Sequence, residues 1–126
     1  MGYHVIDVDD LDVTPDRPSV QRSLSDAAGL SNVAVNVYEA DPGEQLPLAY
    51  HYHDEQEEVF YVLSGTLHVE TPDGELTAGP DEAVVVTPDS PQRAYNPAAA
   101  TDTVRVLAIG APAVDDDAHA YDPDDE

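Results

Sequence analysis

The chain has 126 residues, of which 27 are Asp or Glu and four are Lys or Arg, so its formal net charge is -23. This balance argues against nucleic acid and anionic membranes as partners, because binding to either surface requires clustered cations. Cysteine is absent, which excludes disulfides and thiolate chemistry, and no stretch approaches the roughly 20 apolar residues of a membrane span.

The acidic charge predicts a folded domain with an acidic surface rather than disorder, because 41% of the residues are hydrophobic and fall in regular patterns. A surplus of carboxylates without any lysine resembles proteins of salt-accumulating halophiles, of the haloarchaeal type. A mesophile protein with an acidic partner-binding surface is the alternative. The acidic N-terminus lacks a signal-peptide pattern, so we expect a soluble cytoplasmic protein.

The predicted elements are short strands separated by turns. Residues 3–8 are predicted to be a strand, 9–20 a loop, and one helical turn is expected between Ser23 and Gly29. Alternating or β-branched runs predict further strands. These lie at 31–40, 51–65, 82–88, 92–96 and 103–110, with a hairpin at 66–78 that turns at Pro72-Asp73-Gly74.

The C-terminal segment differs from the rest of the chain. Seven of its twelve residues, 115–126, are acidic, and it has no periodic apolar positions. We therefore expect a single domain over 1–114, followed by an acidic, flexible tail over 115–126. Many short strands with turns between them predict an all-β sandwich or closed barrel.

The stretch HYHDEQEEVFYVLSG, residues 51–65, contains the candidate site. In a strand, His51 and His53 point to the same face, as two ligands of one metal must. Glu58 shares a face with the apolar Phe60 and Val62, and a carboxylate on such a face requires a partner that a cation would supply. Taken alone, His-x-His also fits two solvated side chains on an exposed strand.

Two longer patterns resemble the motifs of the cupins. The first is Pro42-Gly43 followed by His51-x-His53-x4-Glu58-x6-Gly65, over 43–65. The second runs over 79–96, from a glycine through Pro88 to Gln92 and Asn96. Glutamine stands at position 92, where the family's third histidine is expected.

The resemblance implies an all-β, double-stranded β-helix (jelly-roll) barrel with its site inside one mouth. By position it implies the metal ligands His51, His53, Glu58 and Gln92, with the glutamine donating its carbonyl oxygen. Two nitrogen and two oxygen donors suit a divalent transition metal, namely Zn, Mn, Fe, Ni or Co. No other cofactor is indicated.

Two classes of function remain open at this stage, because the cupin fold supports many activities. One is a metal-dependent small-molecule enzyme, such as a dioxygenase or an isomerase, whose catalytic residues are unknown. The alternation of the strand turns Glu57, a possible acid or base, away from the site. The other class is a non-catalytic module that binds a small molecule or metal. A homodimer is also expected, because the predicted strand with Ile6 and Val8 needs a sheet to cover it.

Stability should depend steeply on salt. The melting temperature is expected to rise between low and molar KCl, because the screening length falls to about 3 Å at 1 M and suppresses repulsion among the carboxylates. Calorimetry across this range measures the effect. An unchanged melting temperature would show that the acidic residues are not an adaptation to salt.

Overall fold

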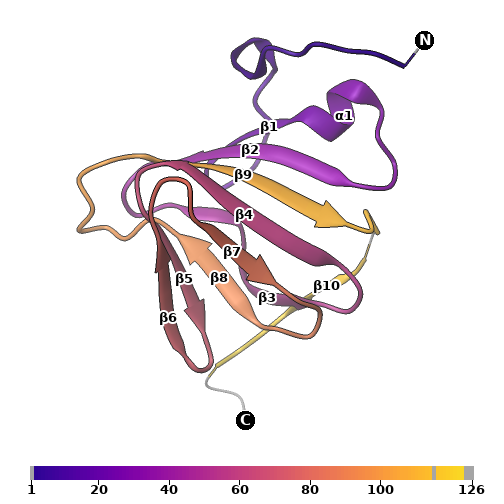
Figure 1. The fold of residues 1–126 in the computed structure, drawn as a ribbon. Coiled ribbons are helices and arrows are strands. Elements are labelled where there is room, and N and C mark those ends of the chain that lie inside the picture. The colour runs from indigo at the N-terminus through magenta and orange to yellow at the C-terminus, as the bar shows by residue number, and fades with distance from the viewer. Residues whose placement is uncertain (1, 115, 124–126) are drawn as a thin grey trace.

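Two five-stranded antiparallel sheets face each other in the computed structural model, which describes residues 2–114 and 116–123 (Figure 1). One sheet has the order β1-β2-β9-β4-β7 and the other β10-β3-β8-β5-β6. The strands are β1 (Val20–Ser23), β2 (Ala34–Ala40), β3 (Gln45–His53), β4 (Glu57–Ser64), β5 (Leu67–Thr71), β6 (Gly74–Ala78), β7 (Ala83–Val86), β8 (Gln92–Tyr95), β9 (Val104–Ala111) and β10 (Ala118–Ala120).

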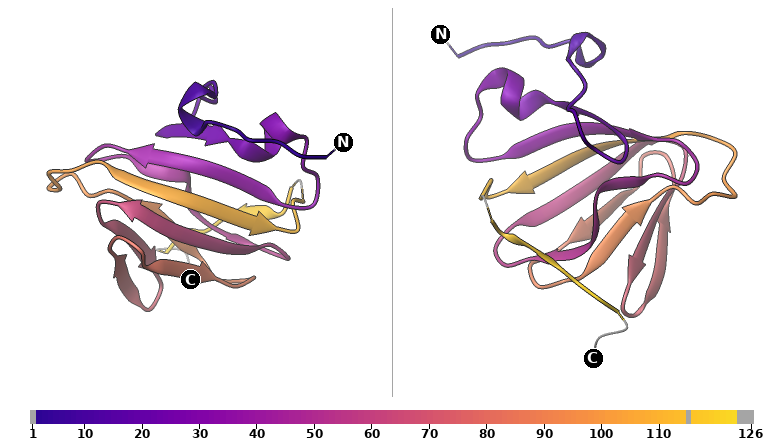
Figure 2. Two further views of the ribbon diagram at one scale, coloured as in Figure 1. Left: turned by 45° about the horizontal axis from the view of Figure 1, so that its top comes forward. Right: turned by 180° about the vertical axis from the view of Figure 1, so that it is seen from behind.

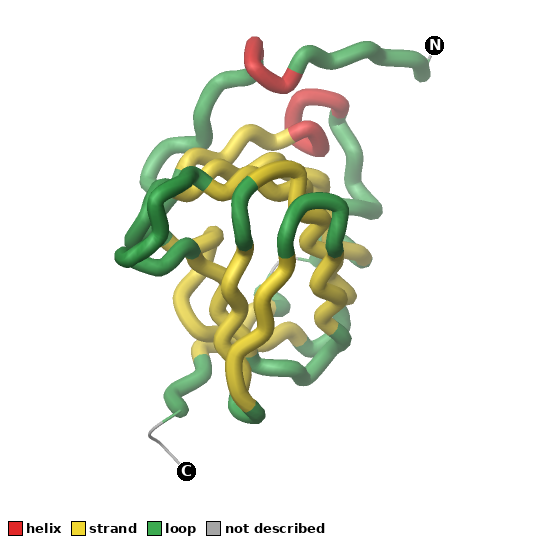
Figure 3. Tube along the Cα trace, turned by 60° about the vertical axis from the view of Figure 1, so that its left-hand side comes forward, coloured by secondary structure: helices red, strands yellow, loops and turns green. Residues whose placement is uncertain are grey.

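The core lies between the two sheets. Alternate residues of most strands point inward, and most of the buried ones are apolar. Phe60 and Val62 from β4, Leu67 and Val69 from β5, and Val106 from β9 are each at most 1% exposed. Strands that are consecutive in the sequence often lie in different sheets. For example, β6 forms the edge of one sheet and the next strand, β7, forms the edge of the other. This arrangement confirms the expected jelly-roll, and Figure 3 shows helix only outside the strand layers.

The helical turn and the hairpin expected from the sequence are both present in the structure. Helix α1 (Leu24–Ala28) is capped by Ser23, whose hydroxyl accepts from the backbone N–H of Asp26, and it ends at Gly29 in the left-handed conformation. The hairpin β5–β6 forms at the expected place. No helix in the described ranges is long and apolar enough to cross a membrane.

The strand expected at 3–8 is absent, which corrects that prediction. Asp7 instead accepts from the backbone N–H of Asp9 and caps a short 3-10 helix, η1 (Val8–Asp10). Tyr3 and Val5 are exposed in the single chain, and β1 occupies the sheet edge instead. The homodimer was inferred from that strand, and it stays an untested prediction.

The segment expected to be a flexible tail contains a strand, which corrects that expectation for residues 118–120. These residues form β10 and pair with β3, with Ala118 opposite His53 and Ala120 opposite His51. The right view of Figure 2 shows this segment, in yellow, running diagonally toward the C-terminus, where β10 forms the sheet edge next to β3. The preceding Asp117 is buried. The segment pairs through its backbone, so it needs no apolar alternation.

Two glycines of the chain have nearly the same left-handed backbone but different surroundings. Gly65, which ends the first motif, has φ 77°, and a Cβ there would lie 2.6 Å from the carbonyl oxygen of Thr103. Gly29 has φ 68° with open space around it. Gly65 is therefore required both for its backbone conformation and for the close approach of the loop before β9.

Alanine substitutions of these two glycines measure how much the close approach at Gly65 contributes to the free energy of unfolding. Gly29→Ala should lower the free energy of unfolding by about 1 kcal/mol, the cost of the left-handed conformation. Gly65→Ala should lower it by roughly 3 kcal/mol, because the Thr103 backbone must also move. Chemical denaturation in molar KCl measures both, and equal losses would contradict the role assigned to the close approach.

Candidate metal centre

Three strands bring the predicted ligands to one end of the barrel. His51 and His53 lie at the end of β3, Glu58 near the start of β4, and Gln92 at the start of β8. Backbone pairing places His51 directly opposite Gln92, and the alternation of β3 turns both histidines to the same side. The three strands therefore bring to one end of the barrel residues that are up to 41 positions apart (51 to 92).

The distances fit a common centre for three of them. Donor atoms of His51, His53 and Glu58 all lie within 4.8 Å of one another. The carboxylate oxygen of Glu58 is 2.9 Å from Nε2 of His53 and 3.9 Å from Nε2 of His51. Ligand atoms that each lie about 2.1 Å from one ion are separated by roughly 3–4 Å. The arrangement is therefore close to that of a coordination shell.

Several polar atoms at this point are buried without hydrogen-bond partners among the described residues. These atoms are Nε2 of His53, Oε1 of Glu58 and both amide atoms of Gln92, and Nδ1 on the other side of the His53 ring also lacks a partner. The 2.9 Å contact between His53 and Glu58 is an ion-pair distance without hydrogen-bond alignment. Each unpaired buried polar group costs about 1–3 kcal/mol. A cation bound among these atoms would remove that cost, so the residues fit a metal.

The protonation state of His51 also suits a metal ligand. Its Nδ1 lies 2.7 Å from the carbonyl oxygen of Ala49, to which the Nδ1–H donates, so Nε2 carries the free lone pair. Burial lowers the pKa of His51, which favours the neutral imidazole that a metal requires. The contact with Glu58 raises the pKa of His53, against the opposing effect of burial.

Gln92 is 2% exposed, and two hollows lie near this end of the barrel. A cavity of about 100 Å³ on one side is lined by the two histidines, Glu58 and Tyr38, among others. A wider hollow of about 440 Å³ on the other side lies between the β5–β6 hairpin and β7, and Gln92 forms part of its wall. Gln92 thus lies opposite His51 in the backbone ladder, but its side chain lines the wider hollow rather than the small cavity.

The remaining candidates lie outside the centre, as the sequence predicted. Glu57 is exposed. Two arginines of the chain form ion pairs with surface carboxylates, Arg22 with Glu39 and Arg93 with Glu70. Arg93 also lies over a tyrosine ring on the outer face of its sheet.

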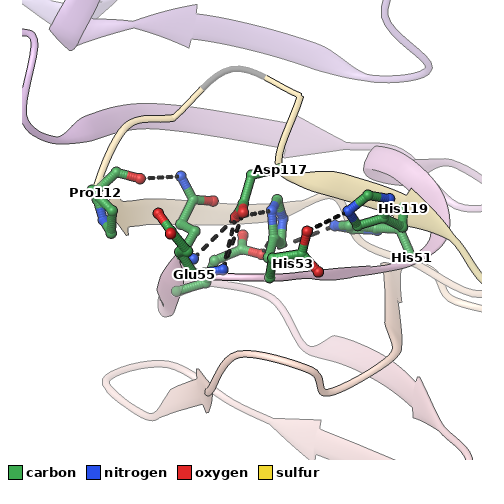
Figure 4. A network of polar contacts seen from close by, with 9 residues as sticks. His51, His53, Glu55, Pro112, Asp117 and His119 are labelled. Atoms are coloured by element: carbon green, nitrogen blue, oxygen red, sulfur yellow. Dashed lines mark hydrogen bonds and ion pairs between the residues drawn. The ribbon is translucent and has the colours of Figure 1, made fainter.

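Sequence reasoning missed Asp117, whose carboxylate Oδ2 lies 3.4 Å from Nδ1 of His53 (Figure 4). Burial alone would raise the pKa of Asp117, but the backbone N–H groups of Gln56 and Glu55 hold it below its ordinary value. Asp117 is one acid among seven in its segment, so composition alone could not single it out.

The comparisons with known proteins agree with this geometry. The family model described as "Cupin domain" matches residues 36–110, from β2 through β9. The chain belongs to the cupin family. No curated protein matches its sequence.

Solved structures of other cupin-like proteins resemble this chain closely. A protein from Acidithiobacillus ferrooxidans, provisionally named as a sugar phosphate isomerase, is 29% identical with a TM-score of 0.66, and the match covers 74% of this cupin and 58% of that chain. This cupin thus spans somewhat over half of that protein. A sugar phosphate isomerase from Silicibacter pomeroyi is 26% identical, with a TM-score of 0.73 and coverage of 86% and 75%.

The polyketide cyclase RemF from Streptomyces resistomycificus is 20% identical, with a TM-score of 0.78 and coverage of 95% of this cupin and 86% of that chain. At this identity the similarity supports the fold alone. The cupin fold thus occurs in proteins described as isomerases and as a cyclase, and the site must indicate the chemistry.

The position of Gln92 opposite His51 leads to a sharp prediction. Gln92→His should raise affinity for Zn²⁺, Ni²⁺ or Co²⁺ about tenfold, or about 1.4 kcal/mol, because imidazole is a better donor than an amide oxygen. His53→Ala should weaken binding. Competition against a chelator of known affinity measures both variants. Equal affinity of wild type and Gln92→His would remove Gln92 from the ligand set.

Proposed function

We propose that this cupin binds one divalent transition metal through His51, His53 and Glu58, with Gln92 as the fourth ligand, and acts as a metal-dependent enzyme on a small molecule. One observation carries the proposal. Donor atoms of His51, His53 and Glu58, from the neighbouring ends of β3 and β4, converge at the buried barrel mouth, and those of His53 and Glu58 have no hydrogen-bond partner among the described residues.

The reaction class that fits best is isomerisation. Two of the similar structures are described as sugar phosphate isomerases, at 29% and 26% identity. A bound divalent metal would supply a Lewis acid for a carbonyl or hydroxyl oxygen. Two histidines and two oxygen donors suit Zn, Mn, Fe, Ni or Co, all of which accept such a ligand set.

The residues of the mouth have separate tasks in this proposal. His51, held by the Ala49 carbonyl, presents a fixed Nε2. Tyr38 lines the smaller cavity, and burial raises its pKa to about 12, so it keeps its hydroxyl proton at neutral pH and can donate it in a hydrogen bond to substrate. The surrounding apolar side chains limit access of water, which strengthens each polar contact.

Charge favours an uncharged substrate. The described residues that line the two hollows include no Lys or Arg, and Glu58 lies among them. Apart from the proposed metal, a phosphate group would therefore meet carboxylates and no cationic side chain among the described residues that line this mouth. We infer a neutral compound with adjacent oxygen atoms, such as a free sugar or a related hydroxycarbonyl compound, in place of a sugar phosphate.

A non-catalytic binding module is the second candidate, and the size of the smaller cavity favours it. A volume of about 100 Å³ accommodates about three water molecules, at roughly 30 Å³ each. Storage or sensing of a metal needs no more space than this. Turnover of any substrate by the metal-loaded protein would show that it is an enzyme rather than a binding module.

Metal content is the first test of the proposed function. Protein purified in molar KCl without an affinity tag should carry one equivalent of a first-row transition metal by elemental analysis. His53→Ala should carry much less, whereas Glu57→Gln, an exposed neighbour, should match the wild type. A metal-free wild type that also fails to take up Zn²⁺ or Co²⁺ would refute the proposal.

Substrate charge is tested with the loaded protein. Neutral aldoses and ketoses should be interconverted, whereas the corresponding phosphates should be turned over at least tenfold more slowly. Preference for the phosphates would contradict the inference from charge while leaving the metal centre intact.

A further inference from the structure

Asp117 holds the turn between the two strands that carry the histidines and Glu58. Its backbone carbonyl accepts from the N–H of Asp54 at 3.2 Å. Its carboxylate accepts from the N–H groups of Glu55 and Gln56, each at 3.0 Å. One residue of the C-terminal segment thus binds three consecutive amides of the β3–β4 turn (Figure 4).

The same carboxylate also lies beside His53. Oδ2 of Asp117 is 3.4 Å from Nδ1, an ion-pair distance without hydrogen-bond alignment, while Nε2 on the opposite side of the ring is 2.9 Å from Glu58. The side chains of His53 and Asp117 are only 12% and 5% exposed. Because backbone donors fix the carboxylate, it is a stationary acceptor on the side of the imidazole that faces away from the centre.

We propose that Asp117 is a positioning residue of the metal centre: it keeps the ring proton of His53 on Nδ1, so that Nε2 presents its lone pair to the ion. This inference rests on the proposed metal binding. Carboxylates that accept from a ligating histidine orient the ring and increase its basicity, and their loss typically weakens metal affinity 10- to 100-fold.

The two histidines are then oriented by different groups. His51 donates to a neutral main-chain carbonyl within its own strand, that of Ala49. His53 faces a carboxylate delivered by residues 117–120, where β10 pairs with β3. In this proposal the acidic C-terminal segment therefore contributes to the metal centre by orienting one of its ligands. Asp117 is not itself a ligand in this arrangement, because its oxygens are occupied by backbone donors and lie beyond the ring.

The test compares two isosteric substitutions at neighbouring positions. Asp117→Asn keeps the size but replaces one carboxylate oxygen with an amide that cannot accept from the ring. Asp116→Asn is the matched control: its side chain is exposed, and its φ of 60° suits asparagine. Co²⁺ affinity, measured by chelator competition in molar KCl, should fall 10- to 100-fold in Asp117→Asn and stay unchanged in Asp116→Asn.

A second measurement on metal-free protein separates orientation of His53 from support of the turn. Unfolding equilibria are measured for Asp117→Asn, His53→Ala and the double variant. Direct contact predicts non-additive effects, by about fivefold or more in the unfolding constant. The Asp116→Asn and His53→Ala pair should be additive.

The outcomes distinguish this inference from the proposed function. A wild type that binds no Co²⁺ overturns the proposed function, and the metal role of Asp117 with it. A wild type that binds Co²⁺ with Asp117→Asn of equal affinity overturns this inference alone. Lost affinity with an additive cycle also overturns it, because Asp117 would then act only through the turn. Lost affinity with a non-additive cycle supports it.

Discussion

Polar side chains buried without partners at the barrel mouth are the constraint on which the arrangement of this end depends. Unpaired groups of this kind are expensive in an apolar interior, at about 1–3 kcal/mol each. Pairing of β3 with β8 sets His51 against Gln92, and β4 is held between β7 and β9, which fixes Glu58 from both sides. The strands therefore hold the donors together, and the groups cannot separate to reach water.

The surrounding residues make this burial possible. Gly110 lies opposite Glu58 in β9, and a Cβ there would come within 2.7 Å of the Gln56 side chain. Gln56 in turn donates to the carbonyl of Pro112 at 3.2 Å. An amide thus closes the mouth over the site, and a glycine leaves the space for it.

Much of the site could be predicted from sequence because side-chain alternation carries the information. The period of two put His51 and His53 on one face and Glu58 on an apolar face, and the structure brings these three together.

Asn96 shows that part of the motif is structural. Its side-chain N–H groups donate to the carbonyls of Ala40 and Asp102, which ties the end of β8 to β2 and to the following loop.

Features formed through the backbone could not be predicted in this way. The strand β10 uses main-chain pairing with β3, and Asp117 binds main-chain amides, so neither leaves a periodic pattern. The opposite error occurred at residues 3–8, where apolar alternation exists but β1 already occupies the sheet edge. Alternation reports which face a strand would bury, whereas only the fold decides whether a sheet edge is available to it.

The net charge of -23 affects what reaches the mouth, but in a way that depends on salt. At low ionic strength the whole surface attracts cations and repels anions over tens of ångströms. In molar salt the field is screened within about 3 Å. Only groups in direct contact with a ligand can then distinguish a cation from an anion. At the mouth the nearest side-chain charges are Glu58 and Asp117, which attract a metal ion, and a bound divalent ion would offset their negative charges. Attraction of a metal ion should therefore persist in salt that abolishes the long-range field, because it originates within the centre itself.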